Sequence, residues 1–233
     1  SCRQRSNGPV PPFRVAPFRS STMLPADLRS AEAEALAAVQ AALASQTRGL
    51  WSVEFRFEGL RILPVALRLL AALTPQRPEA RLLFPDAGAT ALAKRDAPDQ
   101  AGQLLGLGDL LRLQQADGGS EGLVLLAAPT PADYEEVESL CAQHRGPLVM
   151  INGRLEDAAV GIGTVARERR KGFLAEWQAA YALVPTSEGA LRRAFPEPWE
   201  LYRSDPDGYR SVTTFESRPD REQQLEALEE AAR

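Results

Sequence analysis

Residues 123–154 read LVLLAAPTPADYEEVESLCAQHRGPLVMINGR and hold two apolar runs, 123–126 and 148–151, with a helical pattern between them. A helix is predicted to begin after Thr130, because a hydroxyl cap, Pro131 and acidic residues suit the first turn of a helix. It is predicted to end at Gly146-Pro147. Continuously apolar strands that alternate with helices are typical of a parallel sheet covered on both faces.

The same alternation extends toward the N-terminus. Apolar spacing predicts helices over 28–43 and 60–73, the alternating residues 53–57 predict a half-buried strand, and 81–84 predicts a strand before a helix that begins near Ala89. The run 110–113 is a further strand candidate. The region 100–120 is the best candidate for a mobile loop.

The C-terminal third is less regular. A helix over 164–178, strands at 181–184 and 211–215, and an acidic helix over 220–232 are predicted, with the aromatic and proline segment 195–202 packed along an edge. The predicted fold class is therefore α/β, with a largely parallel sheet, helices on both faces and an antiparallel edge. We expect one domain over 23–219, a disordered basic leader over 1–22 and a C-terminal acidic helix over 220–233. Because the leader is rich in Arg and lacks acids, a transit peptide is the alternative interpretation.

Composition excludes several classes of protein. One His (His144) and two Cys (Cys2 and Cys141) cannot form a four-ligand zinc site, and a catalytic triad would depend on that single imidazole. The 31 acidic residues against 27 basic ones argue against nucleic acid as the main partner. The apolar stretch 60–73 is shorter than the roughly 20 residues that cross a bilayer. We predict no metal, no cofactor and no catalytic residues, and the oligomeric state stays open.

Polar residues follow three predicted strands at their carboxyl ends. They are Asp86, Thr130, Asn152 and Arg154, and they would converge on one crevice if these strands are neighbours. The alternative is that Asp86 and Asn152 only bind turn backbone. Cys141 and His144 are interpreted as a small core residue and a structural helix cap.

Gly161, Gly163 and the following Arg167 fit a glycine-rich phosphate-binding pattern, which uses backbone N–H groups at a helix start. The pattern lies nine residues beyond the preceding strand, however, so a tight turn that begins a helix is the competing interpretation. The basic helix that follows, with Arg169, Arg170 and Lys171, could attract phosphate or an acidic partner, or form a solvated face. Phe195, Trp199 and Tyr202 could form a recognition patch or pack at the edge of the core.

Several motifs resemble a plant and cyanobacterial family that carries a domain-of-unknown-function label. They are 53–55, 84–88 with 91–93, the strand into Asn152-Gly153-Arg154-Leu155, 161–167, and the distinctive 189–199 segment that ends in Phe-Pro-x-Pro-Trp. The family usually has Pro where this chain has Gly153, which predicts a more flexible loop here.

The resemblance implies an α/β domain with an accessory role in an oxygenic phototroph. Family members include a chloroplast protein needed for photosystem II accumulation, which acts with a thylakoid insertase, and an extension of a chloroplast adenylate kinase. The expected partner is a photosynthetic membrane-protein complex or its assembly machinery. The expected location is the cyanobacterial cytoplasm, peripheral to the thylakoid, or the chloroplast stroma. The alternative is an enzyme or sensor that binds a nucleotide or another phosphorylated small molecule.

Overall fold

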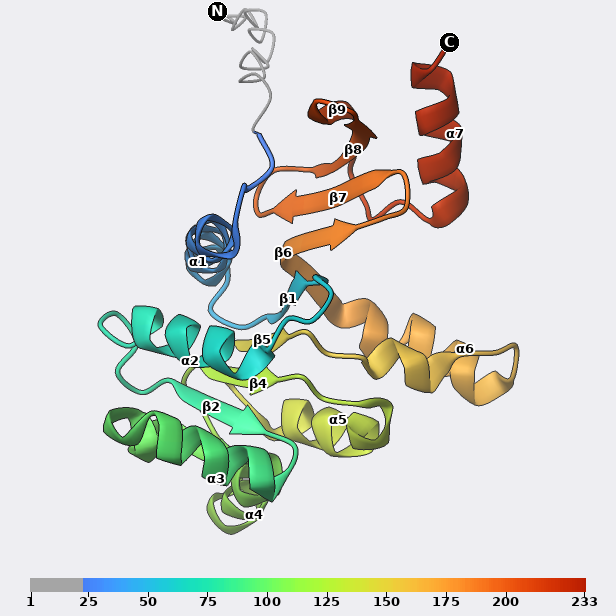
Figure 1. Ribbon diagram of the computed structural model, residues 1–233. Helices are drawn as coiled ribbons and strands as arrows, with labels where there is room; N and C mark the ends of the chain where they lie inside the picture. Colours follow the sequence, from blue (N-terminus) through green and yellow to red (C-terminus); the bar gives the residue numbers. More distant parts are fainter. Residues whose placement is uncertain (1–22) are drawn as a thin grey trace, which may run out of the picture.

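The computed structural model describes residues 23–233, so the predicted leader lies outside the described residues. Helices and strands alternate along most of the chain (Figure 1). The α-helices are α1 (Leu28–Ser45), α2 (Ile62–Leu73), α3 (Ala87–Asp96), α4 (Leu107–Asp117), α5 (Tyr134–Gln143), α6 (Thr164–Lys171) and α7 (Arg221–Ala231).

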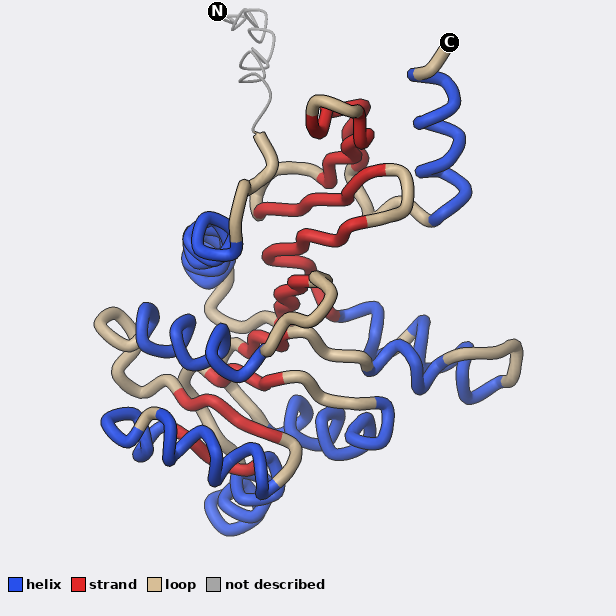
Figure 2. Tube along the Cα trace, in the orientation of Figure 1, coloured by secondary structure: helices blue, strands red, loops and turns tan. Residues whose placement is uncertain are grey.

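The strands form a nine-stranded sheet within the described part, in the order β3-β2-β4-β5-β1-β6-β7-β8-β9. They are β1 (Leu50–Phe55), β2 (Arg81–Phe84), β3 (Leu104–Gly106), β4 (Val124–Ala127), β5 (Leu148–Ile151), β6 (Trp177–Pro185), β7 (Gly189–Ala194), β8 (Trp199–Asp205) and β9 (Gly208–Phe215). The pairs from β3 to β6 are parallel, and those from β6 to β9 are antiparallel. Figure 2 shows the strands as one twisted band through the molecule. The predicted fold class is confirmed.

Two separate clusters of buried side chains divide the helices between the faces of the parallel part. Helices α1, α2 and α3 cover one face, where Val39, Leu70 and Ala93 are buried. Helices α4 and α5 cover the other, where Leu110 and Val137 are buried. This division follows from right-handed crossovers, because connections that run in opposite directions along a sheet place their helices on opposite faces.

Strand β1 lies near the middle of the sheet, between β5 and β6, although it comes first in the chain. Buried and partly exposed side chains alternate along this strand: Trp51, Val53 and Phe55 are buried on the side of α1 and α2. Glu54 therefore points to the opposite face, where it lines a cavity together with Trp177 and Trp199.

Three predictions within the parallel part are wrong. The run 110–113 belongs to α4, and the region 100–120 contains a 3₁₀ helix, β3 and α4 rather than an irregular mobile loop. In α4, Leu107, Leu110 and Gln114 are buried, at the i, i+3, i+7 spacing of one helix face. The helix predicted over 164–178 ends at Lys171, because Gly172 interrupts it before a 3₁₀ turn and β6.

The C-terminal third is more regular than its sequence indicates. The segment 195–202 leads into β8, which lies between β7 and β9, so it is not an edge; β9 is the edge strand. Strand β7 was not predicted. The C-terminal acidic helix is present as α7, which begins at the Asp220 cap.

Candidate functional site

The crevice predicted at the strand ends has the required topology. Strands β2, β4 and β5 are consecutive in the sheet and parallel, so Asp86, Thr130 and Asn152 leave it at the same edge. At β2 and β4, and again at β5 and β1, the following helices lie on opposite faces, which defines switch points of the kind where α/β proteins bind ligands. Whether a ligand can bind at this edge also depends on the hydrogen bonds that these side chains make within the fold.

Each polar side chain at this edge has a protein partner. The Asp86 carboxylate accepts from the Ala89 N–H (3.0 Å) and caps α3. The Thr130 N–H and hydroxyl donate to the Asp133 carboxylate at 2.7 and 2.9 Å. Arg154 donates twice to Asp157, at 3.0 and 2.8 Å. These bonds stabilise turns and helix starts, as the competing interpretation of Asp86 proposed.

Asn152 joins two strands. Its Oδ1 accepts from the Phe55 N–H (2.7 Å) and its Nδ2 donates to the Phe55 carbonyl (2.8 Å), so the amide continues the β5–β1 ladder by one step. The residue has φ of 49°, a conformation that Asn tolerates better than most residues. The Asn152 amide therefore bridges β5 and β1 at their switch point and is not free to face a ligand there.

Gly153 is buried, and a Cβ there would lie 2.3 Å from the Met150 sulfur. Its carbonyl accepts from Arg56 Nη2 at 2.8 Å. The loop is thus anchored at this residue, although its sequence suggested flexibility.

Gly161 and Gly163 lie away from the strand ends, in an exposed loop between a 3₁₀ helix, η3 (Leu155–Ala159), and α6. We call residues 155–171 the arm, because Figure 1 shows this segment projecting sideways beyond α5. Gly163 occupies the N-cap position of α6, and Gly161 has φ of 114°, which favours glycine. The structure therefore shows these glycines as the turn that begins a helix.

Two arginines of α6 brace the arm. Arg169 donates to the Ala158 carbonyl (2.9 Å), and its guanidinium lies 4.2 Å from the ring centroid of Tyr134. Arg170 donates to the carbonyls of Ala159 and Gly161. Arg167 and Lys171 are exposed to solvent. Of the four basic residues predicted to bind a ligand or partner, two are hydrogen-bonded within the arm, and the other two extend into solvent.

The loop of the arm, residues 160–165, exposes aliphatic side chains that sequence reasoning missed. Val160, Ile162 and Val165 are 78%, 93% and 61% exposed. Three of the six large apolar residues exposed in the described part thus lie within six positions of the chain. The signal was present in the sequence, since three branched aliphatic residues stand beside glycines and directly before a basic run.

A cavity of about 520 Å³ lies at the root of the arm, lined by Gly153 before the arm, Glu156 at its start and Leu174 after it. Its floor holds the Glu54 carboxylate, which pairs with Arg218 (2.8 Å). The Arg218 guanidinium in turn lies 5.2 Å from the ring centroid of Trp199. Residues from β1, β8 and the segment after β9 are thereby joined on this face.

The predicted aromatic patch is mostly internal. Trp199 and Tyr202 are 5% and 2% exposed, and Phe195 is half-buried and packs edge-on against Trp51 at a centroid distance of 5.1 Å. Its arrangement is that of residues packed within the core, which was the competing interpretation.

His144 and Cys141 also have internal roles. The His144 Nε2–H donates to the Gly122 carbonyl (2.8 Å), and Nδ1 lies 2.7 Å from the Ser120 hydroxyl. Burial, with Glu176 and Glu138 nearby, raises the pKa of the Cys141 thiol to about 12. A thiol with so high a pKa is a poor nucleophile at neutral pH.

The fold and the arm define a class: a doubly wound α/β domain whose sheet continues into an antiparallel part and whose surface carries a projecting basic arm. The chain belongs to the family described as "Domain of unknown function (DUF1995)", whose profile matches residues 25–226. No curated protein matches the chain. Over residues 23–233, no helix combines the length and the apolar character needed to cross a membrane.

Proposed function

We propose that this protein is a non-enzymatic accessory protein that docks transiently, through its arm, on a membrane-protein complex. The observation that carries the proposal is the arm itself, which holds exposed aliphatic and basic side chains together on a braced projection. Contiguous exposed apolar residues mark interaction sites more often than single ones do. The family resemblance supports a photosynthetic complex as the partner, and photosystem II assembly at the thylakoid surface as the setting.

The residues at the strand ends are hydrogen-bonded within the fold, which supports an accessory protein over an enzyme or sensor that binds a phosphorylated ligand there. Thr130 and Asn152 would each have to give up a hydrogen bond within the fold before binding a phosphate. The Asp86 carboxylate would repel a phosphate, and the Arg154 guanidinium is already paired with Asp157. Breaking such bonds costs free energy that a ligand would have to supply.

The test of partner binding is a pull-down from detergent-solubilised thylakoid membranes, with the whole chain as bait. We expect wild-type protein to recover a photosystem subunit or an assembly factor, and Arg167→Gln/Lys171→Gln to recover much less. The matched control is Lys94→Gln/Arg95→Gln, which removes an exposed basic pair at the end of α3. Recovery of no photosynthetic component by the wild-type chain would count against the proposal.

A thermal-shift screen with nucleotides and sugar phosphates tests the enzyme or sensor alternative. Asp86→Ala is expected to lower the melting temperature without any ligand, because it removes the cap of α3, whereas Asp86→Asn keeps a capping group. We expect no ligand-dependent stabilisation in any of these chains. Stabilisation of the wild type that Arg154→Ala abolishes would replace the proposed function with the alternative.

A further inference from the structure

The loop of the arm exposes its aliphatic side chains on a backbone that hydrogen bonds attach to α6. Arg170 reaches from α6 to the Gly161 carbonyl (2.8 Å), and Arg169 to the Ala158 carbonyl (2.9 Å), so the segment that leads into the loop is fixed to the helix. Ile162, which follows the anchored Gly161, remains 93% exposed. A preorganised apolar loop loses little conformational entropy when it enters an apolar environment.

Basic residues follow this loop on α6. Residues 160–172 contain four basic residues and one acidic residue, Glu168. Arg170 uses backbone carbonyls as acceptors, which orient its guanidinium without neutralising its charge. Side chains on a helix tilt toward its N-terminus, so Arg167 is directed back toward the loop. The acids at the base of the arm each have a basic partner: Asp157 pairs with Arg154 at 2.8 Å, Glu135 with Arg169 at 3.8 Å and Glu156 with Arg56 at 4.0 Å.

From this arrangement we infer that the arm binds the surface of an anionic lipid bilayer, with Val160, Ile162 and Val165 inserted between headgroups and Arg167 and Lys171 against the lipid phosphates. This inference deepens the proposed function and rests on it, since the bilayer around a membrane-protein complex then forms part of the surface on which the arm docks. Aliphatic residues beside basic ones are the combination that peripheral proteins use at the boundary of headgroups and acyl chains. A surface that carries negative charge alone would match the basic residues and leave the aliphatic residues in water, whereas an anionic bilayer accommodates both.

Co-sedimentation of the whole chain with protein-free vesicles tests the inference. Vesicles of phosphatidylcholine with phosphatidylglycerol are expected to bind the chain, and phosphatidylcholine alone to bind it weakly. Removing the charges in Arg167→Gln/Lys171→Gln should weaken binding about fivefold per charge at low salt. Removing the apolar group in Ile162→Ser should weaken it about tenfold.

Matched variants separate the arm from the rest of the surface. Leu113→Ser removes an aliphatic residue that is 43% exposed on α4, and Lys94→Gln/Arg95→Gln removes a basic pair on α3. Both should bind vesicles like the wild type. Equal loss in these controls, or undiminished binding of Ile162→Ser, would overturn insertion of the arm.

A direct readout is the variant Ile162→Trp, since the native Trp51, Trp177 and Trp199 are not exposed. Its emission should shift to shorter wavelength with anionic vesicles and be quenched by brominated acyl chains. An unshifted, unquenched spectrum in a vesicle-bound protein would overturn the inference. Because the vesicles contain no protein and the solubilised pull-down contains no bilayer, either result can fail while the other holds.

Discussion

His144 illustrates how burial sets the chemistry of a single residue. It is 6% exposed, and its neutral ring is held between the Gly122 carbonyl and the Ser120 hydroxyl. Burial lowers its pKa below the ordinary value, the effect of nearby carbonyls being smaller and of opposite sign. The folded chain therefore resists protonation at this position.

A pH dependence of stability follows. Above about pH 6.5 the imidazole is neutral in both folded and unfolded chains, so it adds no pH dependence there. As the pH falls below that value, the unfolded chain binds a proton that the folded chain does not, so the free energy of unfolding should decrease until the lowered folded pKa is reached. Urea unfolding across this range should show a shallower slope with pH in His144→Gln than in wild type. Equal slopes would contradict the assignment.

The position of Asn152 could be predicted from the sequence, but its hydrogen-bond partner could not. Its position after an apolar strand placed it at the carboxyl edge, and the structure has it there. Its amide partner, Phe55, is 97 residues away in the chain. No local pattern indicates that β1 lies beside β5, so the bridge that this side chain makes between them could not be foreseen.

Among the elements, β7 and α4 show why some were missed. In β7, Ala190 and Arg192 point to a buried face, yet Arg and Ala are weak indicators of a strand. What makes Arg192 acceptable in the core is Glu34 on α1, 158 residues earlier. In α4, four leucines in seven residues fit a strand as well as one helix face, and only the packing against α5 decides between them.

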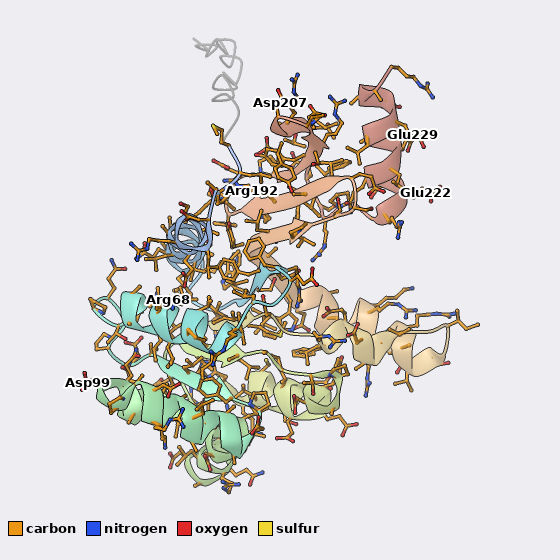
Figure 3. The ribbon with its side chains drawn as sticks, viewed as in Figure 1. Arg68, Asp99, Arg192, Asp207, Glu222 and Glu229 are labelled. Carbon is orange, nitrogen blue, oxygen red and sulfur yellow. The ribbon has the colours of Figure 1, made fainter. Side chains whose placement is uncertain are left out.

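The ion pairs of Arg192 attach α1 to the antiparallel part of the sheet. Its guanidinium, 3% exposed, lies 2.8 Å from Glu34, 3.3 Å from Glu197 and 3.6 Å from Glu200. Figure 3 shows Arg192 beside α1, with Arg68 below on α2. Arg68 pairs with Glu32 of α1, also at 2.8 Å, but is 55% exposed.

Arg192→Met should therefore lower the free energy of unfolding by about 3–5 kcal/mol, because it leaves half-buried carboxylates without their cation. The matched change Arg68→Met breaks an exposed pair and should cost less than about 1 kcal/mol. A double-mutant cycle with Glu34→Gln, measured by urea unfolding, isolates the buried pair. Similar losses for the two arginines would show that burial does not distinguish them.

The molecule as a whole is held by one continuous sheet, and the junction of its two parts is at β6. This strand pairs in parallel with β1 on one side and antiparallel with β7 on the other. The alternation of apolar strands and helices was enough to predict the class of fold. The strand order was not predictable from that alternation. It depends on the direction in which each connecting helix carries the chain along the sheet, and the connection from β5 to β6 crosses β1.

Two neighbouring segments at the C-terminal end of the chain should contribute very differently to the stability of this sheet. Arg218 pairs with Glu54 of β1, across 164 residues of sequence, and covers Trp199 of β8. Helix α7, immediately after it, has no buried residue within its described bounds and packs along β9.

A chain that ends at Pro219 should thus lose less than about 1 kcal/mol of stability. A chain that ends at Glu216 should lose clearly more, since Glu54 is then left without Arg218 in a half-buried position. Urea unfolding followed by tryptophan fluorescence and far-UV circular dichroism distinguishes the two truncations. Coincident transitions are expected for the full chain, because its two parts share β6. A large loss on removing α7 alone would instead place that helix among the elements that hold the sheet.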